Sequence, residues 1–314
     1  MIFLRALRIP VHMSCKILLF ALAVLLLLGE LTAQEPTPRK VKVRNVELTY
    51  IQQGTGEPLI LLHGGQADYR SWLPHLPAFS TKFRTIAYSR RYNYPNDNPI
   101  APGGHSAFVE ADDLAAFLKK LGLKRVHLVG SSVGAYAALI VAVRHPKMVA
   151  TLALAEPNIH GWVKDSPYFE EFTSKAWLPA ARSFREGDDK AAMRYLIDIF
   201  GGPGTFDRMP PAALEVAMQN SKFFKAATLS DDHSPDISRE EVKGLKMPVL
   251  LINGENTFPM FKLIIDEFLR VRPASERAVI PNAGHGSPRQ NPKAFTDAVL
   301  TFIARNDAAT SERH

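Results

Sequence analysis

Short apolar runs alternate along most of this chain with longer segments in which apolar residues recur at helical spacing. Leu59–Leu62 contains no polar residue, and a run without alternation is typical of a strand buried on both faces of a parallel sheet. Strands are predicted for Val41–Val46, Glu47–Gln52, Leu59–Leu62, Thr85–Tyr88, Val126–Val129, Val149–Ala155, Pro248–Asn253 and Ala278–Ile280. Helices are predicted between or after them for Tyr69–Phe79, Ser106–Leu121, Ala135–His145, Pro259–Val271 and Pro292–Ala304. This alternation indicates a doubly wound, mostly parallel α/β sheet with right-handed crossovers.

The alternation stops in one region that is rich in aromatic residues. Helical stretches are predicted there around Ala191–Phe200 and Pro211–Phe224. Open α/β sheets bind ligands at the carboxyl ends of their strands, so an insertion at this point predicts a lid over a binding site. The predicted organisation is therefore a core in two parts, 34–156 and 247–314, with a helical cap over 157–246.

The N-terminus has the pattern of a secretory signal peptide. Basic residues precede the apolar run Ile17–Leu28, and small residues up to Ala33 follow it. The run is shorter than the ~20 residues that a membrane-spanning helix needs. We expect residues 1–33 to be removed and the mature chain to be exported, periplasmic or secreted, without stable membrane insertion. An uncleaved N-terminal membrane anchor remains the alternative.

Composition narrows the classes of function. The chain has 314 residues, of which 46% are hydrophobic and 22% charged, as in ordinary globular domains. Its net charge is +7, but Lys and Arg are spread without a basic run, which argues against a nucleic-acid partner. The single cysteine, Cys15, precedes the apolar run, so the mature chain would have neither a disulfide nor a thiolate metal site.

The segment Gly130–Gly134 reads Gly-Ser-Ser-Val-Gly between a predicted strand and a predicted helix. A Gly-x-Ser-x-Gly pattern in that context projects its middle serine from a strained turn, and its glycines remove Cβ atoms that would collide. Ser132 is therefore the predicted nucleophile, at a helix N-terminus where free N–H groups favour a developing negative charge. Ser131 is the weaker candidate, and an ordinary tight turn is the alternative interpretation.

Acyl transfer by serine also needs a base, an acid that orients it, and hydrogen-bond donors for the oxyanion. His285 follows the last predicted strand, in a loop between two glycines, and is the predicted base. His63, Gly64 and Gly65 follow a buried strand. The backbone N–H groups of Gly65 and Val133 are the predicted oxyanion hole, and His63 is better suited to bracing the loop.

With these three motifs in order, the chain from about Val41 to Ala304 resembles a protein of the α/β-hydrolase fold. The motifs that carry the resemblance are His-Gly-Gly, Gly-x-Ser-x-Gly and Gly-His. The resemblance implies a Ser–acid–His triad beneath a helical cap inserted after the sixth strand. It also implies that the protein uses no cofactor and no metal.

The acid departs from the pattern of most such proteins. They carry an aspartate after the seventh strand, in Gly-Glu-x-Asp, where this chain has Gly254–Thr257 and ends that pattern in a threonine. Some branches of the family instead place the acid at the end of the sixth strand, where Glu156 stands. Neighbouring parallel strands point their carboxyl ends into one crevice, so Glu156 can reach a histidine beside Ser132. Glu156 is the predicted acid and Glu255 the second candidate.

The predicted function is that of an exported serine hydrolase that cleaves a carboxylic ester or a related acyl compound, with a small acyl molecule as its partner. An epoxide hydrolase or a haloalkane dehalogenase is disfavoured, because those relatives need an aspartate where Ser132 stands. A C–C bond hydrolase, a cofactor-free perhydrolase and a non-catalytic ligand-binding protein on the same scaffold stay open. The oligomeric state is unknown from the sequence.

Overall fold

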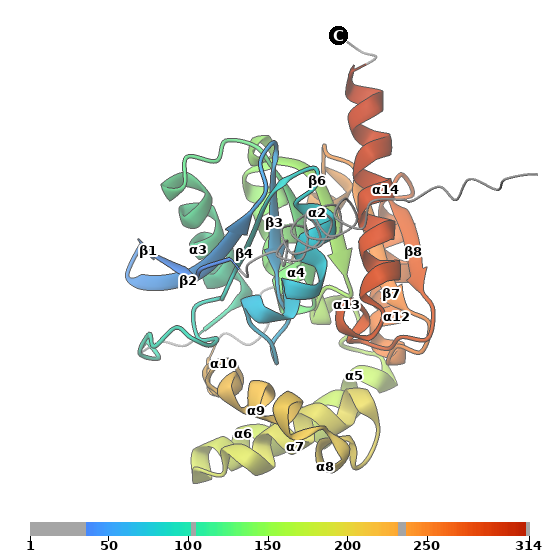
Figure 1. Ribbon diagram of the computed structural model, residues 1–314. Helices are drawn as coiled ribbons and strands as arrows, with labels where there is room; N and C mark the ends of the chain where they lie inside the picture. The colour runs from blue at the N-terminus through green and yellow to red at the C-terminus, as the bar shows by residue number, and fades with distance from the viewer. Residues whose placement is uncertain (1–35, 102–104, 232–236, 312–314) are drawn as a thin grey trace, which may run out of the picture. The chain divides into compact units, whose positions relative to one another are not determined.

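The computed structural model describes residues 36–101, 105–231 and 237–311 (Figure 1). The signal peptide predicted for residues 1–33 lies outside this part of the chain. Within the described ranges, no helix combines the length and the apolar character needed to cross a membrane. The fold below belongs to the unit Thr37–His314.

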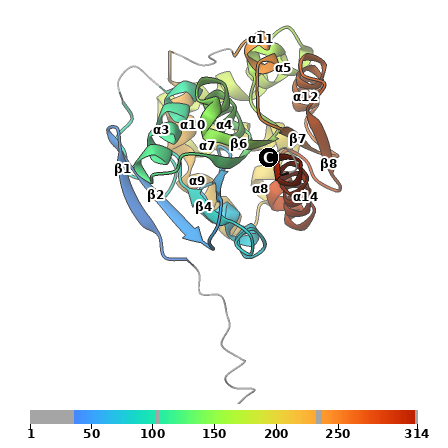
Figure 2. The same ribbon diagram turned by 90° about the horizontal axis from the view of Figure 1, so that it is seen from above.

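Eight strands form a single sheet in the order β1-β2-β4-β3-β5-β6-β7-β8. They are β1 Arg39–Val43, β2 Val46–Gln53, β3 Pro58–Leu62, β4 Arg84–Tyr88, β5 Val126–Ser131, β6 Val149–Ala155, β7 Val249–Gly254 and β8 Glu276–Ile280. The β1–β2 and β2–β4 pairs are antiparallel, and all the pairs from β4 to β8 are parallel. Figure 2 shows β1 and β2 at one edge of the sheet and β8 at the other. The predicted doubly wound, mostly parallel sheet is confirmed.

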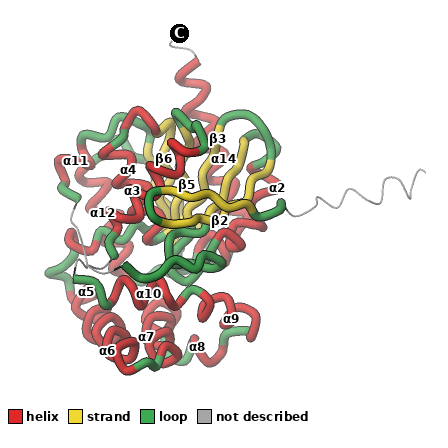
Figure 3. Tube along the Cα trace, turned by 90° about the vertical axis from the view of Figure 1, so that its left-hand side faces the viewer, coloured by secondary structure: helices red, strands yellow, loops and turns green. Residues whose placement is uncertain are grey.

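Helices cover both faces of the sheet, as Figure 3 shows. The helices of the core are η1 Tyr69–His75, α2 Leu76–Phe79, α3 Ala107–Lys120, α4 Val133–Arg144, α12 Pro259–Val271, α13 Ser287–Gln290 and α14 Pro292–Ser311. In β3, Ile60 and Leu62 belong to the hydrophobic cluster that contains α3, α4 and α12, while Leu59 and Leu61 belong to the cluster that contains η1, α2 and α14. Each such fully buried side chain contributes on the order of 1.5–3 kcal/mol. The unbroken apolar run of β3 follows from its burial on both faces.

The segment between β6 and β7 is mostly helical, and much of it gathers at one end of the sheet (Figures 1 and 3). Its described elements are η3 His160–Trp162, α5 Pro167–Phe172, η4 Thr173–Trp177, α6 Leu178–Glu186, α7 Asp189–Gly201, α8 Thr205–Arg208, α9 Pro211–Gln219, α10 Ser221–Thr228 and α11 Arg239–Lys243. Residues of α6, α7, α8, α9 and α10 share a hydrophobic cluster with Tyr92 of the core, whereas α11 packs beside α12. These helices occupy the chain positions predicted for the cap.

Two predicted helices differ in detail from the structure. The helix predicted for Tyr69–Phe79 begins as the 3₁₀ segment η1, which contains Pro74, a residue without the N–H that an α-helix requires. The helix predicted for Pro211–Phe224 is two helices that meet at Asn220. The buried Asn220 amide accepts from the Tyr94 N–H at 2.9 Å and donates to Asp68 Oδ2 at 2.9 Å. The break therefore anchors this segment to two loops of the core.

Candidate active site

A strained residue lies at the turn between β5 and α4. Ser132 has φ 55° and ψ −122°, a conformation that few residues other than glycine adopt. A Cβ at Gly130 would lie 2.5 Å from Ala135 Cα, and one at Gly134 would lie 2.5 Å from the His63 carbonyl oxygen. Both glycines are therefore required by the close passage of strand, helix and neighbouring loop. The turn has the geometry predicted from the sequence, with Ser132 at its apex.

The structure brings together the three side chains that sequence reasoning singled out. His285, in the loop after β8, has its Nε2 3.1 Å from Ser132 Oγ. Its Nδ1 lies 2.5 Å from Oε2 of Glu156, which directly follows β6. The Phe261 ring stacks on the imidazole at a centroid distance of 3.9 Å and an interplanar angle of 9°. His285 is thus fixed between a hydroxyl and a buried carboxylate.

Hydrogen bonds hold the Glu156 carboxylate in place, whereas Glu255, the second candidate acid, bonds a backbone N–H group. The Glu156 side chain is 1% exposed, and its Oε1 accepts from the Gly254 N–H at 2.9 Å. Its Oε2 accepts from the Thr257 hydroxyl at 2.8 Å. Glu255 instead accepts from the Asn282 N–H at 2.9 Å. The threonine at the usual acid position therefore contacts the carboxylate that has taken the place beside the histidine.

In the loop after β3, the backbone N–H of Gly65 points away from the contacts that hold the loop. The Gly64 carbonyl accepts from His63 Nδ1 at 2.8 Å and from Arg90 Nη2 at 3.3 Å. A trans peptide points its C=O and N–H in opposite directions, so the Gly65 N–H points away from Arg90. Val133 opens α4, and its N–H has no intrahelical acceptor. The Gly65 N–H thus faces away from the contacts that hold its loop, and the Val133 N–H is left without a partner in its own helix.

His63 braces this loop, as the sequence predicts. Its Nε2 accepts from the Arg90 N–H at 3.0 Å, while its Nδ1 bonds the Gly64 carbonyl. Burial, together with the neighbouring Arg90 charge, lowers the pKa of His63 to about 3. The ring is therefore neutral and has both nitrogens engaged.

Asn158 is a contact of Ser132 that sequence reasoning missed. Its Oδ1 lies 2.9 Å from Ser132 Oγ, so the serine hydroxyl faces two acceptors, this amide and His285. No local motif marks Asn158, because the contact arises from the path of the chain two residues after Glu156. Phe261, in α12, was also missed, because no local motif marks its contact with His285.

A cavity of about 410 Å³ opens onto Ser132 and His285. Its walls come from the loop after β3, from α4 and from the helices between β6 and β7. They include aromatic and aliphatic side chains: Phe172, Trp177, Leu196, Ile197, Phe200, Met209, Phe223 and Phe224. His160 also lines the cavity, and burial lowers its pKa to about 4, so this ring is neutral near neutral pH. The cavity is mainly apolar with a few polar groups near the serine.

The model of the Alpha/beta hydrolase family matches residues 59–298, more than half of the chain. The chain belongs to the alpha/beta hydrolase family. It is 24% identical over 279 residues to the 2-(acetamidomethylene)succinate hydrolase of Mesorhizobium japonicum, covering 84% of this chain and 94% of that protein. It is 24% identical over 251 residues to the carboxylesterase YbfK of Bacillus subtilis, covering 78% and 79%. A solved thermophilic esterase from Thermogutta terrifontis, with malate bound, matches at a TM-score of 0.70 and 26% identity over 86% of this chain and 99% of that chain. The protein is thus a hydrolase of the α/β fold.

Behind the site, this hydrolase buries a charged pair. Arg90 Nη1 donates to Glu110 Oε1 at 3.0 Å, and both side chains are almost completely buried. Burial alone would raise the pKa of Glu110, but the Arg90 charge and the hydrogen bond from His105 lower it to about 2. The carboxylate is therefore ionised and its charge is balanced by Arg90. Removing either partner would leave an uncompensated buried charge, which is strongly destabilising.

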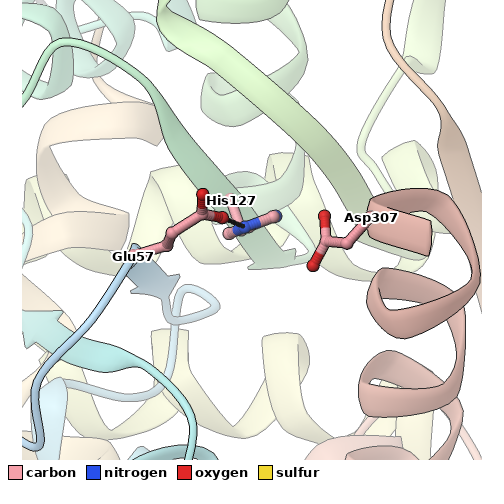
Figure 4. A group of neighbouring side chains, drawn as sticks. All are labelled: Glu57, His127 and Asp307. Carbon is pink, nitrogen blue, oxygen red and sulfur yellow. Dashed lines mark hydrogen bonds and ion pairs between the residues drawn. The ribbon is translucent and has the colours of Figure 1, made fainter. Parts of the chain in front are cut away.

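One group in the described part of the hydrolase has donor atoms spaced for a metal ion. Glu57, His127 and Asp307 place one such atom each within 4.8 Å of one another, and Figure 4 shows the two carboxylates on opposite sides of the ring. His127 already uses both nitrogens, Nδ1 with Thr151 Oγ1 at 2.9 Å and Nε2 with Glu57 Oε2 at 3.0 Å. This hydrogen-bonding explains the cluster without an ion.

Proposed function

We propose that this protein is a serine hydrolase that cleaves carboxylic esters through an acyl-enzyme, with Ser132, His285 and Glu156 as its triad. The observation that carries the proposal is the unbroken series of contacts from the Ser132 hydroxyl through His285 to the buried Glu156 carboxylate. A positioned base and an orienting acid are what convert a weakly nucleophilic hydroxyl into a catalyst.

The proposed reaction has two halves. His285 Nε2 takes the Ser132 proton as Oγ attacks the ester carbonyl, and the Gly65 and Val133 N–H groups bind the resulting oxyanion. The tetrahedral intermediate collapses, the C–O bond to the alcohol breaks, and the imidazolium gives its proton to the departing oxygen. Water then attacks the acyl-enzyme by the same route, which releases the acid and restores the serine. Glu156 stabilises the imidazolium in both halves without itself becoming protonated.

Two features support an ester as substrate. The cavity is mainly apolar, which suits an acyl or aryl group. The relatives include proteins named as a carboxylesterase and an esterase. We also propose that residues 157–246 act as a cap that completes this cavity, because helices from that region line it.

We further propose that the protein is exported with cleavage after Ala33. The support is the basic, apolar and small-residue succession of the N-terminus. N-terminal sequencing of protein recovered outside the cytoplasm should give Gln34 as the first residue. Soluble cytoplasmic protein that retains Met1 would contradict export.

A fluorophosphonate probe tests the activated serine even while the natural substrate is unidentified. The wild-type protein should become covalently labelled, and peptide mass analysis should place the label on Ser132. Ser131→Ala should label like wild type, and Ser132→Ala should not label. A panel of p-nitrophenyl esters graded by acyl length should then be hydrolysed with a clear optimum. A wild-type protein that neither labels nor hydrolyses any ester would favour a binding protein instead.

A further inference from the structure

Arg289 brings a positive charge to the wall of the cavity. It lies in α13, four residues after His285, and lines the same cavity as Ser132. Its Nη2 lies 3.7 Å from the position that a Cβ on Gly286 would take, so the guanidinium lies beside the residue that follows His285. Its fork of N–H donors therefore lies next to the loop that carries His285, in the cavity that contains Ser132.

The other charged groups around this cavity are balanced within the protein. Glu110 pairs with Arg90, and Glu156 contacts His285. His63 and His160 have pKa values lowered to about 3 and about 4 and are neutral at pH 7. The Arg289 guanidinium, by contrast, makes no hydrogen bond or ion pair with any residue in the described part of the chain.

Arg289 is a cation crowded by protein at the wall of the cavity. The side chain is exposed, yet burial lowers its pKa, and no carboxylate raises it. The guanidinium is therefore crowded by protein and still accessible to a ligand. A partly desolvated cation without a counter-ion costs free energy, which an anionic ligand would recover. The N-terminus of α4, at Ser132, adds to the positive potential in the same cavity.

We propose that Arg289 binds a carboxylate carried by the substrate, so that the preferred substrates are esters that bear a second, free carboxylate. This proposal rests on the ester hydrolysis proposed above and names its substrate class. A guanidinium suits a carboxylate because its parallel N–H groups can bind both oxygens at once. A hydrogen bond to a charged group contributes about 1.5–3 kcal/mol, which corresponds to roughly 10- to 150-fold in kcat/KM.

Three esters that share one reporter chemistry test the proposal. Phenyl butyrate is neutral, phenyl hydrogen succinate carries the charge in its acyl part, and 4-(butanoyloxy)benzoate carries it in its alcohol part. Arg289→Met keeps the apolar stem and removes the charge. Arg185→Met is the matched control, because Arg185 is exposed on α6 and absent from the cavity wall. Release of the phenol gives kcat/KM for each protein with each ester.

Arg289→Met should lower kcat/KM by about 10- to 150-fold for at least one anionic ester, and by less than about twofold for phenyl butyrate. The ester that responds identifies which part of the substrate Arg289 holds. Arg185→Met should leave all three values near wild type. Added salt should weaken the wild-type preference, as expected for attraction between charges.

Equal effects of Arg289→Met on neutral and anionic esters, or no effect on any of them, would overturn the proposal. Fluorophosphonate labelling of Ser132 in the variant separates this result from a loss of fold or of the nucleophile. If the wild type cleaves no ester, the proposed ester hydrolysis is refuted independently of the proposed charge recognition. Calorimetry with succinate then tests the charge recognition: binding that Arg289→Met abolishes supports it, and absence of binding to the wild type refutes it.

Discussion

Glu156→Gln is the change that tests the unusual acid most sharply. The structure dictates how the new amide must sit. The Gly254 N–H can only donate, so the amide oxygen has to take the place of Oε1 opposite it. The NH₂ group then faces His285 Nδ1, where it can only donate. The imidazole must respond by accepting at Nδ1 and carrying its proton on Nε2.

The magnitude follows from this change of tautomer. An imidazole protonated on Nε2 cannot accept the Ser132 proton across the 3.1 Å contact. In a serine protease, the same exchange of acid for amide lowers turnover by ~10⁴, or about 5.5 kcal/mol in activation free energy. The amide keeps the shape of the carboxylate and its bond to Gly254, and the Thr257 hydroxyl can turn to accept. The melting temperature should therefore change by only a few degrees.

The assay is steady-state hydrolysis of a p-nitrophenyl ester with purified variants. Glu156→Gln should lose up to ~10⁴ in kcat, while Glu255→Gln stays near wild type because Glu255 binds the Asn282 N–H. Thr257→Asp in the Glu156→Gln background should restore activity at least tenfold, because Thr257 Oγ1 lies 2.8 Å from Glu156 Oε2. A Glu156→Gln protein that is folded and keeps more than a tenth of its activity would refute this reasoning.

Two further predictions concern stability. Gly134→Ala would place a methyl group 2.5 Å from the His63 carbonyl oxygen, so it should lower the free energy of unfolding by about 1–3 kcal/mol; an unchanged urea midpoint would contradict this. His75 is fully buried, and burial lowers its pKa to about 4, below the value of about 6.5 for an unfolded chain. The unfolded state therefore binds a proton first as the pH falls, so stability is complete above pH 6.5 and declines between pH 6.5 and 4 by about 1.4 kcal/mol per unit. Between pH 7 and pH 5 the wild type should lose about 2 kcal/mol more than His75→Phe, and equal losses would disprove the linkage.

Much of the fold is readable from local pattern, because the signals that specify it are local. The apolar run Leu59–Leu62 predicts a strand buried on both faces, and the sheet confirms it. The strand-to-helix turn around Ser132 is also predicted by its local Gly-x-Ser-x-Gly pattern, although the contact that requires Gly134 comes from the loop after β3. Glu156 could be predicted as the acid of the triad because a threonine stands at the usual acid position.

Other features depend on contacts between distant segments and leave no local signal. Asn220 divides a predicted helix because its amide binds Asp68 and Tyr94, far away in the sequence. Arg90 and Glu110 form their buried pair only once the loop after β4 meets α3. Arg289 reads as an ordinary surface arginine until the cavity shows which way it faces.

The central claim is that Ser132 attacks the substrate, and comparing Ser132→Ala with Ser131→Ala tests it most directly. Both changes remove one hydroxyl, so folding should be preserved in each, as circular dichroism would verify. With the ester that the wild type cleaves best, Ser132→Ala should lose ~10⁴ to 10⁶ in kcat, and Ser131→Ala should stay within about tenfold of wild type. A Ser132→Ala protein that still turns over within tenfold of wild type would contradict the account.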